Sequence, residues 1–291
     1  MSFRSSLAIL AGKSSRWFLH NFMHGGTSLP GKLTLKIDPN VLQTLAKDYE
    51  IIVITGTNGK TLTTALTVKV LESKFGHVLT NKSGSNMKQG IVTAFLSDKV
   101  SEKSGKKLAV LETDETYDKI LTGIRMHPDA LVIANGDAPI FNSKELKNKV
   151  VYYGFADKEE EDQKAPANTD GLLCPHCHHI LHFKYRTYSN LGKYFCPECG
   201  FKRPELTYSL NQISSQSPQS SVFEIDGAKV ELHIGGTYNI YNALAAYSVG
   251  RALGLSGDES ARALSDNDEK VFGRQEVINI DDKQTTLILV K

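Results

Sequence analysis

Hydrophobic and polar positions along the chain form two alternating patterns: short continuous apolar runs and longer stretches with helical spacing. Residues 49–54 (YEIIVI) form a short, β-branched run that predicts a buried strand, and residues 62–75 carry apolar side chains at intervals of a helical turn. Further apolar runs of strand length occupy residues 107–111, 130–134 and 150–153, with helical patterns between them. This alternation predicts an α/β fold with a parallel-rich sheet covered on both faces.

Turn-forming residues punctuate this pattern. Glycine and proline in residues 25–32 (GGTSLPGK) predict a turn, after which residues 39–47 predict a short helix leading into the first strand. Residues 222–226 and 228–234 flank an Asp-Gly pair, a dipeptide whose turn matches the twist of paired strands. The second half of the chain is therefore expected to contain a β-hairpin.

Composition places the chain among ordinary globular proteins, with 40% hydrophobic and 23% charged residues. The 34 basic residues against 32 acidic ones leave a net charge of +2, so charge gives no argument for a nucleic-acid partner. No apolar run reaches the roughly eighteen residues that a membrane-spanning helix needs, and the first residues lack the features of a secretory signal. We therefore expect a cytoplasmic protein without a transmembrane segment.

The stretch from residue 3 to 23 leaves two interpretations open. It mixes large apolar side chains with basic ones, namely Leu7, Leu10, Trp17, Phe18 and Phe22 with Arg4, Lys13, Arg16 and His20. An amphipathic helix of this kind can rest on a membrane surface. It can also pack on its own domain, which is the commoner reason for such a pattern.

A candidate phosphate-binding loop lies between the first strand and its helix, in VITGTNGKTLTT (residues 53–64). Its glycines depart from the spacing G-x-x-x-x-G-K-[ST], but backbone N–H groups at a strand-to-helix turn bind an anion without that spacing. The lysine can reach the terminal phosphates, and the threonine hydroxyl can join a magnesium shell. The expected nucleotide-binding residues are Gly56, Thr57, Asn58, Gly59, Lys60 and Thr61. The alternative is a glycine turn that only joins strand to helix.

The strand at residues 107–111 ends in the acidic sequence LETDE. Glu112 is the first carboxylate there, and the C-terminal end of a strand beside a phosphate loop suits a magnesium ligand, directly or through water. Asp114 and Glu115 are near enough to contribute, although acids that merely begin a helix give the same pattern. We expect Glu112 and Thr61 to hold magnesium.

All four cysteines of the chain lie in two C-x-x-C pairs with eighteen residues between them, at Cys174, Cys177, Cys196 and Cys199. This spacing is typical of a zinc ribbon, in which a hairpin brings two thiolate pairs into a tetrahedron. Two disulfides are the competing interpretation, and a cytosolic chain disfavours them. A histidine could also replace a cysteine as ligand, the candidates being His176, His178, His179 and His182. A closed four-cysteine site builds structure and does not catalyse.

Two asparagines, Asn239 and Asn242, lie one turn apart at the start of a helix in GTYNIYNALAA. Their side-chain amides can recognise the edge of a base or cap the helix. The spacing alone leaves both roles open.

The stretch GTNGKT resembles the signature of the Mur ligase superfamily, whose members use ATP to phosphorylate a carboxylate that an amine then attacks. The resemblance implies an ATP-dependent carbon–nitrogen ligase that uses ATP and Mg2+, with Lys60 and Glu112 as its catalytic residues. It also implies that Asn239 and Asn242 bind the nucleotide. Arg274, in FGRQE, resembles the family's arginine near the hinge to a third domain, where it would meet a phosphate; an ordinary surface arginine is the alternative.

The same resemblance sets the expected domain organisation. A helical segment at 1–48 would pack on a central ATP-binding domain at 49–291, which a zinc-ribbon insertion at 172–206 interrupts; the family's C-terminal ligase domain would be absent. After LETDE the family normally has a further strand and a metal-organising motif such as DHLD, whereas this chain continues directly with TYDKILTGI. We expect that a stretch is missing near Thr116, the alternative being a naturally shortened protein.

A four-cysteine ribbon inside a Mur-ligase central domain resembles, more narrowly, the family of ligase subunits of lipid II isoglutaminyl synthase. The supporting stretches are GTSLPGK, TNKSGSNMKQG, ANGDAP and GTYNIYNALAA. This resemblance implies amidation of the α-carboxylate of D-glutamate in lipid II through an acyl phosphate, with ammonia from a GatD-like glutamine amidotransferase, at the inner face of the cell membrane. The alternatives are an amino-acid ligase of the folylpolyglutamate synthase type and a zinc-ribbon nucleic-acid-binding ATPase.

Overall fold

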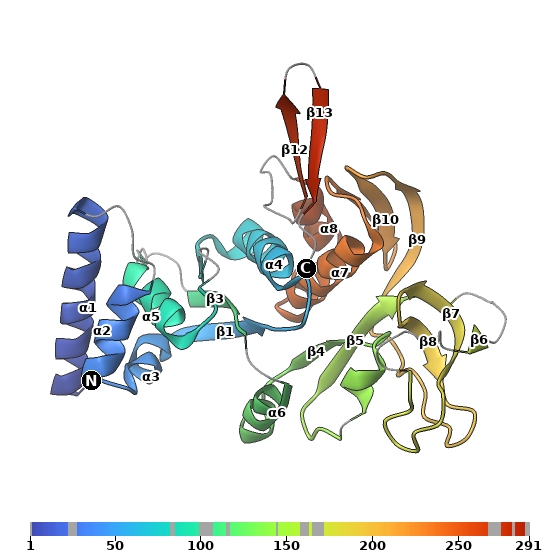
Figure 1. Ribbon diagram of the computed structural model, residues 1–291, viewed down its shortest axis with the longest axis horizontal. Coiled ribbons are helices and arrows are strands. Elements are labelled where there is room, and N and C mark those ends of the chain that lie inside the picture. Colours follow the sequence, from blue (N-terminus) through green and yellow to red (C-terminus); the bar gives the residue numbers. More distant parts are fainter. Residues whose placement is uncertain are drawn as a thin grey trace. The chain divides into compact units, whose positions relative to one another are not determined.

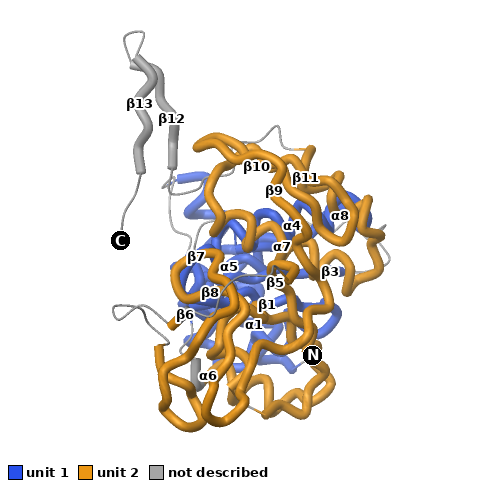
Figure 2. The backbone as a smooth tube through the Cα atoms, turned by 90° about the vertical axis from the view of Figure 1, so that its right-hand side faces the viewer, with its two compact units in different colours: residues 1–115, 273–291 blue, residues 116–272 orange. Residues whose placement is uncertain are grey.

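The computed structural model describes residues 2–22, 28–81, 85–98, 107–114, 117–143, 145–157, 163–164, 172–266, 275–280 and 283–288. The chain divides into two compact units, unit 1 with residues 1–115 and 273–291 and unit 2 with residues 116–272 (Figure 2). The predicted domain division at residues 48 and 49 is a different partition and stays a prediction. Each unit is described by itself.

Unit 1 begins with helices and continues as a small α/β fold (Figure 1). Its elements are α1 (Phe3–Phe22), α2 (Leu29–Ile37), α3 (Val41–Ala46), β1 (Tyr49–Ile54), α4 (Lys60–Phe75), β2 (Val78–Thr80), α5 (Lys88–Ser97) and β3 (Lys107–Glu112). The three strands form a parallel sheet in the order β1-β3-β2. The strands and the helix that hydrophobic periodicity predicts in this part of the chain are confirmed.

The prediction that β1 is a buried strand is wrong for two of its side chains. Tyr49 packs with Phe95 and other apolar side chains of α3, α5 and β3. Ile51 and Val53 lie farther along the same face and are 41% and 57% exposed. A continuous apolar run therefore predicts the strand correctly, but it does not predict how much of the strand the neighbouring helices bury.

The predicted turn at residues 25–32 is replaced from Leu29 onward by helix α2; residues 23–27 lie outside the described part of the chain. Pro30 falls in the first helical turn, where its missing N–H costs no hydrogen bond. Gly31 allows close contact with α5, because a Cβ atom added there would lie 1.9 Å from the backbone oxygen of Gln89. Pro and Gly here support tight helix packing and do not mark a turn.

Unit 2 contains a mixed sheet in the order β11-β10-β9-β5-β4. Its strands are β4 (Val132–Asn135), β5 (Val150–Phe155), β9 (Tyr208–Gln216), β10 (Ser221–Ile225) and β11 (Ala228–Leu232), and its helices are α6 (Tyr117–Met126), the 3-10 turn η1 (Pro139–Asn142), α7 (Thr237–Ala252) and α8 (Gly257–Ser265). Strands β4, β5 and β9 run parallel, whereas β9, β10 and β11 are antiparallel. The predicted hairpin is confirmed: Asp226 and Gly227 have φ angles of 48° and 85°, as its turn requires.

A second, smaller sheet of unit 2 consists of β6 (Gln163–Lys164), β7 (His182–Tyr188) and β8 (Leu191–Phe195), and it carries the cysteine pairs. The hairpin of β12 (Gln275–Ile280) and β13 (Lys283–Ile288) belongs to unit 1. Among the described residues, no helix combines the length and apolar character needed to cross a membrane. The predicted α/β class with a parallel-rich sheet is confirmed, although the parallel strands are shared between the sheets of two units.

Replacing Gly31 by alanine tests the close contact between α2 and α5. In an open helical position alanine stabilises relative to glycine by about 0.5–1 kcal/mol, but the clash with Gln89 should outweigh this gain and cost about 1–3 kcal/mol. Gly123→Ala in α6 is the matched control, because a Cβ atom there meets nothing within 4 Å. We expect the urea midpoint to fall for Gly31→Ala and to stay or rise for Gly123→Ala. Equal midpoints for the two variants would contradict the packing described here.

Candidate functional site

The turn between β1 and α4 has the backbone geometry of an anion-binding loop. Gly56 and Gly59 have φ angles of 150° and 79°, conformations that L side chains rarely adopt. Helix α4 begins at Lys60 directly after Gly59, and no side chain caps its N-terminus. Gly59 therefore offers no side-chain acceptor to the first N–H groups of α4, and a phosphate can take the place of such a cap.

Lys60 lies folded over this loop. Its Nζ donates to the backbone oxygen of Gly56 at 2.8 Å and forms an ion pair with Asp114 at 3.3 Å. The Lys60 side chain is only 16% exposed, whereas Asp114 is 65% exposed. The loop thus holds its cation beside the glycine turn, and Asp114 acts as the counter-charge of Lys60.

Thr61 and Glu112 lie together at the ends of α4 and β3. The Thr61 hydroxyl donates to Oε2 of Glu112 at 2.9 Å, and Glu112 is buried. Asn81 fixes the Glu112 backbone from both sides, because its Nδ2 donates to the Glu112 oxygen at 2.9 Å and its Oδ1 accepts from the Glu112 N–H at 3.0 Å. Hydroxyl and carboxylate oxygens are the ligands that Mg2+ prefers, so these two side chains fit the predicted magnesium role.

Asn81 was not among the residues singled out from sequence. It directly follows strand β2, as Glu112 ends β3, and parallel neighbours present their C-terminal ends at one edge of a sheet. A polar residue at a strand end was therefore the available signal.

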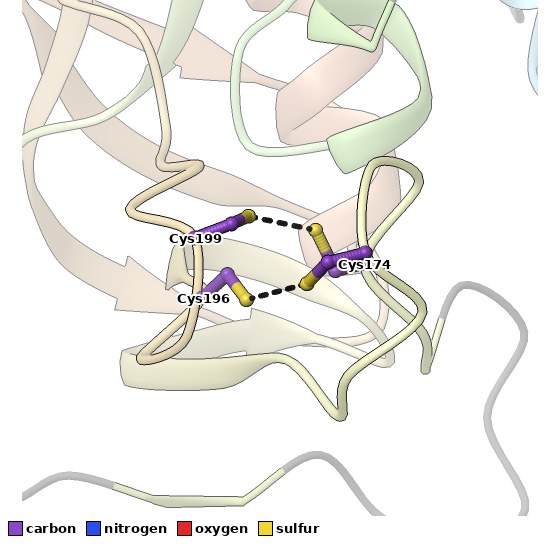
Figure 3. Close-up of side chains that lie close together, drawn as sticks. Cys174, Cys196 and Cys199 are labelled. Atoms are coloured by element: carbon purple, nitrogen blue, oxygen red, sulfur yellow. Dashed lines mark hydrogen bonds between the residues drawn. The ribbon is translucent and has the colours of Figure 1, made fainter.

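The four cysteine sulfurs converge on one centre in unit 2, as Figure 3 shows for the labelled Cys174, Cys196 and Cys199. The Cys174–Cys199 and Cys177–Cys196 sulfur pairs are 3.6 and 3.5 Å apart, and all four sulfurs lie within 4.8 Å of one another. A zinc ion with Zn–S bonds of about 2.3 Å requires sulfur separations of about 3.8 Å in a tetrahedron, so the donor set fits zinc. The separations exclude the competing disulfides, whose sulfurs would be about 2.05 Å apart.

The two cysteine turns have the same local geometry. In each, the N–H four residues after the first cysteine donates back to that cysteine's oxygen, from His178 to Cys174 at 2.9 Å and from Gly200 to Cys196 at 3.1 Å. His178 and Gly200 both have positive φ angles, 60° and 75°. Equivalent residues of the two turns therefore position the four thiols. None of the described histidines belongs to the sulfur cluster.

Backbone N–H groups favour the thiolate form of Cys196. Burial raises the pKa of Cys196, but the N–H groups of Cys199 and Glu198 act in the opposite direction, and the resulting pKa is about 7. At Cys177 and Cys199 backbone N–H groups also act to lower the pKa, but burial and neighbouring cysteines raise it overall. Cys174 and Cys196 are buried among Leu181, Phe183, Tyr194, Phe201 and Leu172, whereas Cys177 and Cys199 are exposed. A metal ion bound by the four cysteines would be covered on one side by this apolar cluster.

A buried ion pair attaches the ribbon to the mixed sheet of unit 2. Arg203 follows the second cysteine turn, and its guanidinium donates to Asp137 at 2.8 Å, with both side chains almost fully buried. Asp137 belongs to the ANGDAP stretch after β4, and its Oδ2 accepts from the Phe155 N–H at 2.8 Å and from the Tyr241 hydroxyl at 2.7 Å. Arg203 also donates to the Phe155 oxygen and the Tyr185 hydroxyl, each at 2.8 Å.

The two partners of this ion pair respond differently: burial raises the pKa of Asp137, although the hydrogen bonds from Tyr241 and Phe155 and the charge of Arg203 act to lower it. Burial alone would lower the pKa of Arg203, but the Asp137 carboxylate raises it. Burial, and then the charge of Asp137, raises the pKa of Tyr241 well above its usual value, so the Tyr241 hydroxyl remains a donor. Sequence analysis missed these residues, because nothing in ANGDAP indicates that its aspartate would meet an arginine 66 positions later.

The remaining predicted site residues lie in unit 2 or outside the described residues. Asn239 and Asn242 belong to α7 of unit 2: Asn239 is buried and donates to the Gly235 oxygen at 2.6 Å, and Asn242 donates to Asn239 at 3.4 Å. These contacts do not cap α7, because its N-cap residue is Gly236 and no side-chain cap hydrogen bond is present, while a nucleotide role stays a prediction. Arg274, Glu115 and Thr116 lie outside the described residues.

Comparisons with known proteins connect the whole chain to one group of enzymes. The chain is 44% identical over 324 aligned positions to the MurT subunit of the glutamine-hydrolysing lipid II isoglutaminyl synthase of Streptococcus pneumoniae R6, covering 100% of this chain and 72% of that protein. It is 32% identical over 285 positions to the MurT subunit of Staphylococcus aureus N315, covering 86% of this chain and 62% of that protein. No protein-family model matches.

A solved structure shares the fold. The pseudomurein peptide ligase type C of Methanothermus fervidus superimposes with a TM-score of 0.60 at 24% identity, over 83% of this chain and 54% of that one. The pneumococcal alignment has 324 positions against 291 residues here, so that relative carries residues at positions that this chain lacks. The alignment length does not distinguish a missing stretch from a naturally shortened protein and does not locate the difference, so the expectation near Thr116 stays a prediction.

Replacing Cys177 by serine tests the zinc site. Loss of one thiolate should weaken zinc retention by more than the roughly 10- to 100-fold that loss of an outer hydrogen-bond partner causes. Zinc per chain, measured by elemental analysis after dialysis against a weak chelator, should fall from one to near zero. The double variant His176→Ala/His179→Ala is the control, and it should keep its zinc because neither histidine belongs to the sulfur cluster. Loss of zinc from the histidine variant alone would overturn the four-cysteine assignment.

Replacing Arg203 by methionine tests the buried ion pair. The change leaves Asp137 buried without its charged partner, which should cost about 3–5 kcal/mol of unfolding free energy. Lys193→Met provides the comparison, because Lys193 pairs with the more exposed Asp157 and should lose no more than about 1 kcal/mol. Urea unfolding of the zinc-loaded protein measures both. Similar losses in the two variants would show that the Asp137–Arg203 pair does not attach the ribbon.

Proposed function

The chain belongs to the family of MurT subunits of lipid II isoglutaminyl synthase, and from this premise we propose that it activates the α-carboxylate of D-glutamate in lipid II for amidation. Membership makes it part of an ATP-dependent ligase of peptidoglycan synthesis. The chain spans 72% and 62% of the two MurT relatives, so the activity of the complete protein is part of the proposal. The observation that carries it is the uncapped N-terminus of α4 with Lys60, Thr61 and Glu112 around it.

The proposed chemistry has two steps. A carboxylate oxygen of D-glutamate attacks the γ-phosphorus of ATP, and the bond to the bridging oxygen breaks so that ADP leaves. The nitrogen of ammonia then attacks the carbonyl carbon of the acyl phosphate, and inorganic phosphate leaves with the electron pair of the C–O bond. Neither step requires a nucleophilic side chain, so the protein's contribution is positioning and charge stabilisation.

Each loop residue has a role that follows from its contacts. The N–H groups at the start of α4 would hold phosphate oxygens, and Lys60 would exchange its present partners, the Gly56 oxygen and Asp114, for the terminal phosphates. Thr61 and Glu112 would hold Mg2+, which when bound neutralises part of the phosphate charge. Asn81 would keep Glu112 at the loop, since it bonds both backbone groups of that residue.

The proposed partner is a GatD-like glutamine amidotransferase that supplies ammonia. Support comes from the description of the relatives as subunits of a glutamine-hydrolysing enzyme. The reaction would take place at the inner membrane face, where a lipid-linked substrate lies. The two alternative functions are set aside, because neither accounts for 44% identity to a MurT subunit over the whole chain.

Alanine at Lys60 tests the nucleotide site. A hydrogen bond to a charged group contributes about 1.5–3 kcal/mol, so Lys60→Ala should weaken ATP binding by roughly 10- to 100-fold. Lys88→Ala is a matched control, because Lys88 is likewise the first residue of a helix, α5, yet donates only to the Pro39 oxygen in the described contacts. Equilibrium binding of a fluorescent ATP analogue to this chain, and amidation by the complete protein with its glutaminase, give the two measurements.

The same binding experiment, carried out over a range of Mg2+ concentrations, tests the magnesium assignment. Glu112→Gln keeps an acceptor for Thr61 and removes the charge, so it should raise the Mg2+ concentration for half-maximal binding at least about 10-fold. Asp114→Asn should leave that concentration unchanged. If Lys60→Ala binds ATP normally, the proposed function fails; if only Asp114→Asn changes the Mg2+ requirement, the metal role moves to Asp114.

A further inference from the structure

Helix α1 packs on its unit through small side chains. Its buried residues are Ser5, Ala8, Gly12 and Leu19, which follow the spacing of one helical face. Gly12 lies so close to α2 that an added Cβ atom would be 2.1 Å from the Thr34 hydroxyl oxygen. Helix α2 packs in turn on α5 (Figure 1). Helix α1 therefore packs within unit 1 through its small residues and not through its large apolar ones.

The large apolar side chains of α1 lie on the opposite face and are exposed. They are Phe3, Leu7, Leu10, Trp17, Phe18 and Phe22, and we call them the outer face of α1. Phe3 is 86% exposed and Trp17 is 63% exposed. At 100° per residue, these positions centre roughly opposite the buried face. Contiguous exposed apolar surface of this kind marks a site of interaction with a protein or a membrane.

The charge of α1 distinguishes between these two kinds of partner. Its twenty residues include Arg4, Lys13 and Arg16 and no aspartate or glutamate. A second copy of the chain docking through this face would bring three positive charges against three more, which is unfavourable. An anionic lipid surface supplies the opposite charge for the basic residues and an apolar layer for the outer face.

We propose that the outer face of α1 docks in the plane of an anionic membrane surface, with Trp17, Phe18 and Phe22 at the level of the lipid headgroups. Tryptophan is enriched at that level because its ring is apolar and its N–H is polar. The three aromatic rings already lie together, with centroid distances of 6.0 Å from Trp17 to Phe22 and 5.0 Å from Phe18 to Phe22. The choice of a lipid surface rests partly on the proposed function, whose substrate is lipid-linked.

Trp17 reports directly on this proposal, because it is the single tryptophan of the chain. The chain is mixed with vesicles of phosphatidylcholine alone or with 30 mol% phosphatidylglycerol, without nucleotide. Transfer of the indole into the headgroup region should shift its emission to shorter wavelength, and brominated acyl chains should quench it. Binding should be several-fold stronger on the anionic vesicles, and Lys13→Glu should weaken it more than about five-fold.

Matched variants distinguish binding through the outer face from nonspecific hydrophobic adsorption to the vesicles. Leu10→Gln/Phe18→Gln removes two side chains of the outer face and leaves Trp17 in place, so it should abolish the emission shift. Leu131→Gln/Phe141→Gln changes the same residue types at exposed positions of unit 2 and should leave the shift intact. Zinc content and ATP-analogue binding confirm that each variant is folded.

Three results would overturn the proposal: an unchanged Trp17 spectrum on anionic vesicles, equal shifts for the two double variants, or a shift that depends on protein concentration without vesicles. The last result would assign the outer face to a second copy of the chain. Because the vesicle assay contains no nucleotide, its failure is distinct from failure of the ATP site. Conversely, loss of ATP binding in Lys60→Ala leaves the vesicle result untouched.

Discussion

The parallel pairing of β1 with β3 is the constraint on which the candidate nucleotide site depends. This pairing places Ile54, the last residue of β1, opposite Glu112, the last residue of β3. The glycine turn leaves β1 at this level, so the first turn of α4 comes next to the carboxylate, and Thr61 reaches Glu112. A shift of one residue in the register would turn the Glu112 side chain to the other face of the sheet. Site geometry is thus a consequence of strand pairing, and the loop sequence alone does not produce it.

In unit 2 the zinc ribbon depends on two different kinds of interaction. The sulfur cluster closes the ribbon on itself, with backbone N–H groups at equivalent places in both cysteine turns. Arg203 and Asp137 then attach the closed ribbon to the strand ends of the mixed sheet, and Tyr185 of β7 adds hydrogen bonds to the Phe155 and Ala156 oxygens. A buried carboxylate with three donors is stable only while every donor is in place. If the sulfur cluster binds zinc, the metal would hold the ribbon in the form that Arg203 connects to the ANGDAP stretch.

Local sequence information predicted most of the elements and the residues whose chemistry is local. The glycine turn before α4, the Asp-Gly hairpin and the cysteine turns were predicted correctly because a few consecutive residues determine each of them. Partners distant in sequence were not found: Asn81 clamps Glu112 across 31 positions, and Asp137 meets Tyr241 across 104. The Pro-Gly pair at residues 30 and 31 misled the prediction, because those residues serve helix packing as well as turns. The spacing of Asn239 and Asn242 could not separate capping from base recognition, since both use the same amide atoms; the structure places Gly236 at the N-cap of α7.

Helix α1 shows why an amphipathic pattern does not by itself identify the buried face. The usual argument assigns large apolar side chains to the interior, because burying them removes the most area from water. In α1 the buried face is instead the one with small side chains, because Gly12 and Ala8 let the helix axis come nearer to α2 than leucine or phenylalanine would permit. Once the small face is buried, the large side chains have no place inside the unit. Their exposure costs free energy in water, and that cost is reduced only where another apolar phase covers them.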